Sequence, residues 1–90
     1  PISNDLNKIR MYPNPFNPVT YIKYQLPIDC LVSLKIYNYR GELVDELVNR
    51  EQKAGFYTME WQATGLSSGV YYYLLETPSK SFNKKMVLLK

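Results

Sequence analysis

Apolar and polar residues alternate in two stretches of the chain, 20–26 and 31–37. The apolar positions of the two stretches are, in order, Ile22, Tyr24, Leu26, Val32, Leu34 and Ile36. A period of two places every second side chain on one face of an extended chain, so each stretch is predicted to be a half-buried strand. Pro27 ends the first strand, because proline has no N–H to donate to a sheet.

Three later stretches are also predicted to be strands: 56–61, 70–76 and 81–89. In the first, Tyr57, Met59 and Trp61 fall on one face. The second is so rich in tyrosine and leucine that both of its faces are expected to be at least partly covered.

The stretch 42–48 has an ambiguous pattern, with apolar residues at 43, 44, 47 and 48. This spacing fits a helical turn or two, and it also fits a strand that contains a bulge. Because the neighbouring segments are predicted strands, we favour a short strand that runs into a loop.

Turn-forming residues separate these segments, at 38–41, 53–55, 64–69 and 77–79. Six or seven short strands spaced roughly 8–12 residues apart indicate an all-β fold, an antiparallel β-sandwich. In this sandwich we expect Tyr71 and Tyr73 to point inward, and Tyr71 to make a bond to a loop backbone like that of a tyrosine corner. Trp61 and the tyrosines are expected to anchor the core by their area, since large aromatic side chains bury about 150–250 Å² each.

The residue types that the chain lacks exclude several classes of function. The 90 residues, 46% of them apolar, fit one globular domain. With no histidine and one cysteine, the chain lacks the residues for a Ser-His-Asp or Cys-His site, an imidazole or cysteine metal site, or an internal disulfide. We therefore expect no enzyme activity, no cofactor and no metal.

The charge and hydropathy patterns exclude two further classes of partner. The net charge is +3, and its lysines and arginines are spread along the chain, whereas nucleic-acid binders show a block or stripe of positive charge. No stretch approaches the roughly 20 apolar residues that a membrane helix needs. The acidic residues are scattered and form no calcium-loop pattern.

Three other features have alternative interpretations. The Pro-Asn-Pro-Phe-Asn-Pro run at 13–18 is predicted to be a stiff loop that seats Phe16 on the core, or a proline-rich ligand for a partner. The tyrosines at 71–73, with Tyr21, Tyr37, Tyr39 and Tyr57, serve either as core or as a sugar-stacking platform. Cys30 is expected to be an incidental buried or semi-buried thiol, since no histidine is present to activate it.

The C-terminal stretch 83–90 contains three lysines, at 84, 85 and 90. In one interpretation they discourage edge-to-edge pairing of a last strand. In the other, the strand is exposed and is offered to a receptor by strand addition.

Several segments, in this order and spacing, resemble the type A C-terminal sorting domain of the type IX secretion system. They are Tyr-Pro-Asn-Pro-Phe-Asn-Pro at 12–18, Val-Ser-Leu-Lys-Ile-Tyr-Asn at 32–38, Ala-Gly-Phe-Tyr at 54–57, Leu-Ser-Ser-Gly-Val-Tyr-Tyr-Tyr at 66–73 and Lys-Lys-Met-Val-Leu-Leu-Lys at 84–90. The resemblance covers residues 11–90. The middle part is also similar to the immunoglobulin-like domain of flagellar hook-capping proteins, which implies an immunoglobulin-like sandwich of about seven strands.

The resemblance implies a non-catalytic signal that directs an upstream cargo across the outer membrane. The implied partners are the covalently attached cargo, the outer-membrane translocon and a sortase-like peptidase that removes the domain. The implied location is secreted or on the cell surface, reached through the periplasm. The implied recognition residues are Gly55, Tyr57, Gly69, Tyr71, Leu75, Lys85 and Lys90.

The resemblance also divides the chain into residues 1–10, a linker from the upstream cargo, and residues 11–90, the sorting domain. The chain starts at Pro1 rather than at methionine, so we expect it to be part of a longer protein. The alternative function is an accessory carbohydrate-binding or spacer module of a secreted hydrolase.

Overall fold

The computed structural model describes residues 10–12 and 18–89, and all regular secondary structure in these ranges is β-strand. The strands are β1 (Arg10–Tyr12), β2 (Val19–Leu26), β3 (Cys30–Asn38), β4 (Leu43–Gln52), β5 (Gly55–Gln62), β6 (Gly69–Glu76) and β7 (Ser81–Leu88). The all-β prediction is confirmed.

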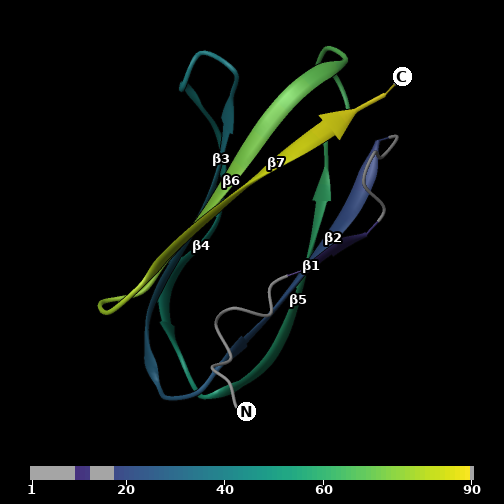
Figure 1. The fold of residues 1–90 in the computed structure, drawn as a ribbon. Coiled ribbons are helices and arrows are strands. Elements are labelled where there is room, and N and C mark those ends of the chain that lie inside the picture. The colour runs from purple at the N-terminus through teal and green to yellow at the C-terminus, as the bar shows by residue number, and fades with distance from the viewer. Residues whose placement is uncertain (1–9, 13–17, 90) are drawn as a thin grey trace.

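The strands form two sheets that face each other (Figure 1). One sheet has three strands in the order β1-β2-β5, and the other has four in the order β4-β3-β6-β7. Every neighbouring pair is antiparallel. The predicted antiparallel sandwich of about seven strands is therefore confirmed, and an immunoglobulin-like description is compatible with it.

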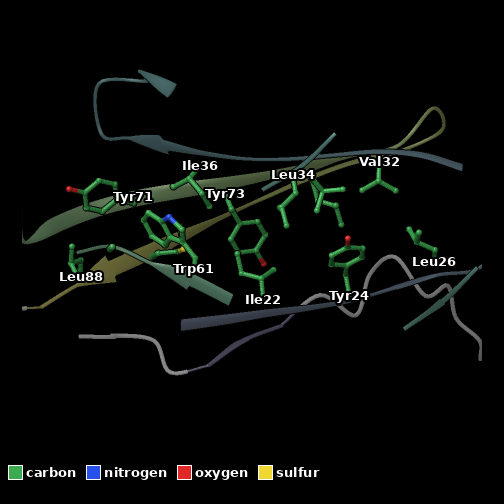
Figure 2. Packing of buried hydrophobic residues seen from close by; sticks show 14 of the residues in the cluster. Ile22, Tyr24, Leu26, Val32, Leu34, Ile36, Trp61, Tyr71, Tyr73 and Leu88 are labelled. Atoms are coloured by element: carbon green, nitrogen blue, oxygen red, sulfur yellow. The ribbon is translucent and has the colours of Figure 1, made fainter. Parts of the chain in front are cut away.

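The alternating residues of β2 and β3 point into the space between the sheets, as predicted. Their six apolar positions are each at most 2% exposed. Figure 2 shows these side chains meeting Trp61, Tyr71 and Tyr73 in one continuous core. Because a strand's side chains alternate strictly, burial of one face exposes the other, where Tyr21 of β2 is 42% exposed.

The expectation of a short strand followed by a loop at 42–48 is wrong, because β4 is a ten-residue strand. Its register with β3 shifts twice, so that Val44 and Leu47 have no direct partner across the pair. Each shift is a bulge, which inserts one extra residue and interrupts the alternation. Two bulges explain why the apolar residues of this strand show no period of two.

The strands β5, β6 and β7 lie where the sequence predicts them, and Tyr57, Met59 and Trp61 share the inward face of β5. The strand β1 was not predicted, because three residues are too few to show a period. The predicted proline-rich loop, whose residues 13–17 include Phe16, lies outside the described residues.

Two polar side-chain bonds connect the sheets through β4. The Tyr24 hydroxyl donates to Oε1 of Gln52 at 2.7 Å, and Nε1 of Trp61 donates to Oδ2 of Asp45 at 3.1 Å. Both donors belong to the three-stranded sheet and both acceptors to β4. The first bond is buried and the second is partly buried, and a hydrogen bond forms only within a narrow range of positions of its partners, so these bonds help to fix how the sheets face each other.

The buried hydroxyl of Tyr73 lacks the hydrogen bond to a described residue that a buried polar group usually has. Tyr73 is fully buried, and its hydroxyl has no hydrogen-bond partner within the part of the chain that the structure describes. Figure 2 shows the ring in the middle of the core, with its hydroxyl end toward Ile22. Burial raises the pKa of Tyr73 to about 12.

We predict that Tyr73→Phe raises the free energy of unfolding by about 1–3 kcal/mol at neutral pH, the usual cost of a buried unsatisfied polar group. In the unfolded parent the phenol ionises near its ordinary pKa of 10, whereas burial keeps the folded phenol protonated up to about pH 12, so the parent loses stability as the pH rises from 10 toward 12. The variant should therefore lose less stability over that range.

Urea unfolding followed by circular dichroism at pH 7 and at pH 11 measures both effects. Tyr24→Phe is the control, because the Tyr24 hydroxyl does have a buried partner in Gln52. That variant should lose stability at pH 7. A loss of stability in Tyr73→Phe at pH 7 would contradict the prediction.

Candidate functional site

The last strand, β7, lies at the edge of the four-stranded sheet. Within residues 10–12 and 18–89, it pairs with β6 alone, from Gly69 opposite Leu88 to Glu76 opposite Ser81. Figure 1 shows β7 in yellow along the outside of the sheet. The edge of a sheet is the place where another chain can be added by backbone pairing.

Lysines lie on both faces of this edge strand. Lys84 is opposite Tyr73, whose side chain points inward, and Lys85 is opposite Tyr72, whose side chain points outward. Both lysines are exposed, while Met86 and Leu88 further along the strand are fully buried. The strand is thus held by its apolar end and carries positive charge in its middle.

The two glycines among the predicted recognition residues begin strands and have special backbone geometry. Gly55 begins β5 with φ +149°, and Gly69 begins β6 with φ +151°. A side chain is disfavoured at these angles even though a Cβ atom would meet nothing within 4 Å at either position. Each glycine therefore has a role in the backbone path of its strand.

Tyr71 joins the core to the loop before β6. Its hydroxyl donates to the backbone oxygen of Ser67 at 2.8 Å, which confirms the predicted bond to a loop backbone. Its ring meets Trp61 edge to face, with the ring centres 5.9 Å apart. Only 7% of Tyr71 is exposed, so little of it is accessible to a partner while the domain is folded.

Tyr57 has a similar role at the other sheet. Its ring stacks on Tyr24 at 5.4 Å between centres, and its hydroxyl donates to the backbone oxygen of Lys53 at 2.6 Å. The ring supports the inner face of the three-stranded sheet, and the bond holds the turn before β5.

The comparisons with known proteins agree with this architecture. A family model described as a secretion system C-terminal sorting domain matches residues 10–89. The chain belongs to this family. A search of curated proteins found no match.

A solved structure with the same fold is that of PorZ, described as an essential bacterial surface component of the type-IX secretion system of Porphyromonas gingivalis. The match has a TM-score of 0.70 and 24% sequence identity, and it covers 94% of this chain. It covers only 12% of PorZ, so this similarity is evidence for a shared fold of one part of that protein.

Membership in the family has direct consequences. Its members are sorting signals of the type IX secretion system, which implies interaction with the secretion machinery and export to the cell surface or beyond. In the described ranges there is no group of three or more metal-ligating side chains, and no helix that is long and apolar enough to cross a membrane.

The structure does not bring the predicted recognition residues of the sorting domain together at one surface. Gly55 and Tyr57 belong to the three-stranded sheet, and Gly69, Tyr71, Leu75 and Lys85 to the four-stranded sheet. Leu75 is fully buried, whereas Lys85 is exposed. Lys90 lies outside the described residues. A direct contact with the translocon stays a prediction for each of the seven.

The sorting domain also has a hollow of about 460 Å³ at one end, lined in part by Pro27, Ile28, Leu31 and Pro78. Cys30 lies beside it and is 9% exposed, as expected for a buried thiol. Burial raises the pKa of this thiol, and the charges of Glu51 and Asp29 act in the same direction. Cys30 is thus kept protonated, which is the unreactive form.

Among the tyrosines that the sequence offered either as core or as a sugar-stacking platform, Tyr37, Tyr39 and Tyr72 lie together at the outer face of the four-stranded sheet. Tyr37 and Tyr72 are direct neighbours across β3 and β6, and Tyr39 follows at the end of β3. The alternation in 70–76 already places Tyr72 opposite to Tyr71 and Tyr73. The sequence could not reveal that Tyr72 is next to Tyr37, because only the pairing of the strands decides that.

Proposed function

We propose that this domain directs an upstream cargo protein across the outer membrane through the type IX translocon, which recognises the edge strand β7. The observation that carries the proposal is the match to the sorting-domain family over residues 10–89. The position of β7 as the last strand in the order of the four-stranded sheet supports it, because receptors can recognise a strand at the edge of a sheet.

The lysines of β7 fit this role. Lys84 and Lys85 provide exposed positive charge on β7, and charge of one sign raises the rate at which an oppositely charged partner is met. An acidic surface on the translocon would therefore be guided to β7, and backbone pairing would follow. Lys90 is proposed to extend this charge at the C-terminal side.

The proposal includes the fate of the domain. The cargo first reaches the periplasm, the domain folds and binds the translocon, and the cargo arrives on the cell surface or is released. A sortase-like peptidase then cuts within or before residues 1–10, the proposed linker, and leaves the domain of residues 11–90 behind. The compact core supports this order, because a receptor that reads a strand edge needs the sheet to be formed.

The test is the double change Lys85→Ala and Lys90→Ala in the full-length cargo. We expect the cargo to accumulate in the periplasm, since the change removes charge from the recognition strand. Lys85 is exposed, and changes at exposed sites usually alter stability by less than about 0.5 kcal/mol, so its replacement should keep the fold. Cell fractionation and immunoblotting measure the exported fraction.

The matched control is Lys23→Ala with Lys80→Ala, which removes the same charge from exposed positions outside β7. This control should be exported normally. Normal export of the Lys85 and Lys90 double variant would overturn the proposed role of these lysines. Normal export of a cargo that lacks the whole domain would overturn the sorting function itself.

A further inference from the structure

A hollow of about 340 Å³ lies on the outer face of the four-stranded sheet, away from the core. Its lining includes Tyr37, Tyr39, Tyr72, Leu74 and Asn83. Its size is at the lower end of the range of about 300–1,000 Å³ that is usual for small-molecule sites. The export function proposed above makes no use of this surface.

The strand register explains why these side chains gather. Tyr37 of β3 is directly opposite Tyr72 of β6, and Leu74 of β6 is directly opposite Asn83 of β7. Directly opposite residues project from the same face with their Cβ atoms about 4.5–5.5 Å apart. Three strands therefore contribute neighbouring side chains to one continuous surface.

One wall of the hollow is the turn between β3 and β4, and this turn is held by its own hydrogen bonds. Oδ1 of Asn38 accepts from the backbone N–H groups of Arg40 at 2.9 Å and Glu42 at 3.0 Å. Gly41 has φ +81° and donates its backbone N–H to the Asn38 carbonyl at 3.0 Å. A wall fixed before binding reduces the ordering cost of binding.

The ring of Tyr39 is also held in place. The Arg40 guanidinium lies over it, 5.7 Å from the ring centre. A cation over an aromatic ring is attracted to it, so this contact fixes one face of the ring and favours one orientation. Tyr39 is 70% exposed and remains accessible from its other sides.

The side chains that line the hollow indicate which kind of ligand fits it. Its side chains combine aromatic rings with neutral polar groups, and no charged residue of the described chain lines it. Tyr37, Tyr72 and Asn83 make no side-chain hydrogen bond to another described residue, so their phenols and amide are available to a ligand. A sugar ring has an apolar C–H face that suits an aromatic ring, and hydroxyl groups that suit phenols and amides.

We propose that this hollow binds a neutral saccharide, with Tyr37 and Tyr72 contacting the sugar ring and Asn83 bonding its hydroxyl groups. The absence of lining charge argues for a neutral ligand, because a charged one would lose hydration without gaining an ion pair. The site would give the exported domain an affinity for glycans in addition to its sorting function.

The test is a titration of the ¹⁵N-labelled 90-residue chain with cellohexaose, laminarihexaose, mannohexaose and chitohexaose, followed by NMR. We expect saturable shifts with at least one of these probes, centred on Tyr37, Tyr72 and Asn83. Tyr72→Ala and, separately, Asn83→Ala should each raise the dissociation constant about tenfold or more, which corresponds to the loss of one good contact.

Tyr21→Ala is the matched control, because Tyr21 is 42% exposed on the outer face of the other sheet, against 38% for Tyr72. It should leave saccharide binding unchanged. Asn83 is exposed, so Asn83→Ala tests the site even if Tyr72→Ala unfolds.

Three outcomes would overturn the proposal. The first is that none of the four probes gives saturable shifts at millimolar concentration. The second is that Tyr21→Ala weakens binding as much as Asn83→Ala does. The third is that a polyproline peptide, which also binds aromatic grooves, shifts these residues while the saccharides do not. Export of the cargo does not depend on any of these outcomes, so this proposal and the sorting function fail separately.

Discussion

Replacing Trp61 with alanine is expected to lower the free energy of unfolding by about 3–5 kcal/mol, the usual cost of removing a large aromatic side chain from a core. Trp61 is 2% exposed and meets Tyr71 edge to face. Its indole N–H also reaches Asp45 of the facing sheet. The change therefore removes core volume, an aromatic contact and a link between the sheets.

The loss matters because domains of this kind have a total stability of only about 5–15 kcal/mol. A 90-residue chain is near the small end of the range in which one core suffices. Trp61→Ala is thus expected to be partly or wholly unfolded at 37 °C. Thermal unfolding followed by far-ultraviolet circular dichroism measures this, since the variant has no tryptophan fluorescence.

Trp61→Phe separates the contributions. It keeps an aromatic side chain in the core and removes the bond to Asp45, so it should be destabilised less than the alanine variant. Asp45→Asn keeps an acceptor for the indole N–H and is expected to be closest to the parent. An unfolding midpoint of Trp61→Ala equal to that of the parent would contradict the central place of Trp61 in this core.

The second large effect is expected for Leu75→Ala, with a loss of about 2–5 kcal/mol. Leu75 is fully buried in β6, directly opposite Leu34 of β3 and Phe82 of β7. Removing its side chain leaves a cavity between β3, β6 and β7. Urea unfolding of the isolated 90-residue chain measures the loss.

Leu75 is also one of the predicted recognition residues, so the same change is expected to reduce export of a full-length cargo. The buried position favours an indirect cause, in which export falls because less of the domain is folded. Leu75→Met tests this, because a swap that conserves volume usually costs less than about 1.5 kcal/mol. If export follows stability, Leu75→Met should be exported almost normally.

A different result for Leu75→Met would indicate direct recognition of Leu75. Failure of Leu75→Met to be exported, with an unfolding midpoint close to that of the parent, would show that the translocon reads Leu75 itself. The same comparison applies to Tyr71, which is 7% exposed and bonded to Ser67. Among the predicted recognition residues, Lys85 differs from these two, because its side chain is exposed in the folded domain.

Features that depend on neighbouring residues could be predicted from the sequence, and features that depend on contacts between distant residues could not. Alternation in β2 and β3 was sufficient to predict which side chains are buried, because it depends only on the geometry of an extended chain. The pattern failed in β4, where bulges at Val44 and Leu47 interrupt the alternation. A bulge is a property of two paired strands, so one strand's sequence shows it only as an irregularity.

The sequence by itself determined the all-β class, the faces of most strands, and the absence of histidine and of paired cysteines. These are properties of neighbouring residues or of composition. Only the tertiary structure decided that β7 is an edge strand, that Trp61 reaches Asp45, and that Tyr72 lies beside Tyr37. The physical reason is that sheet order and register arise from contacts between residues distant in the chain, and a single alternating pattern is compatible with many pairings.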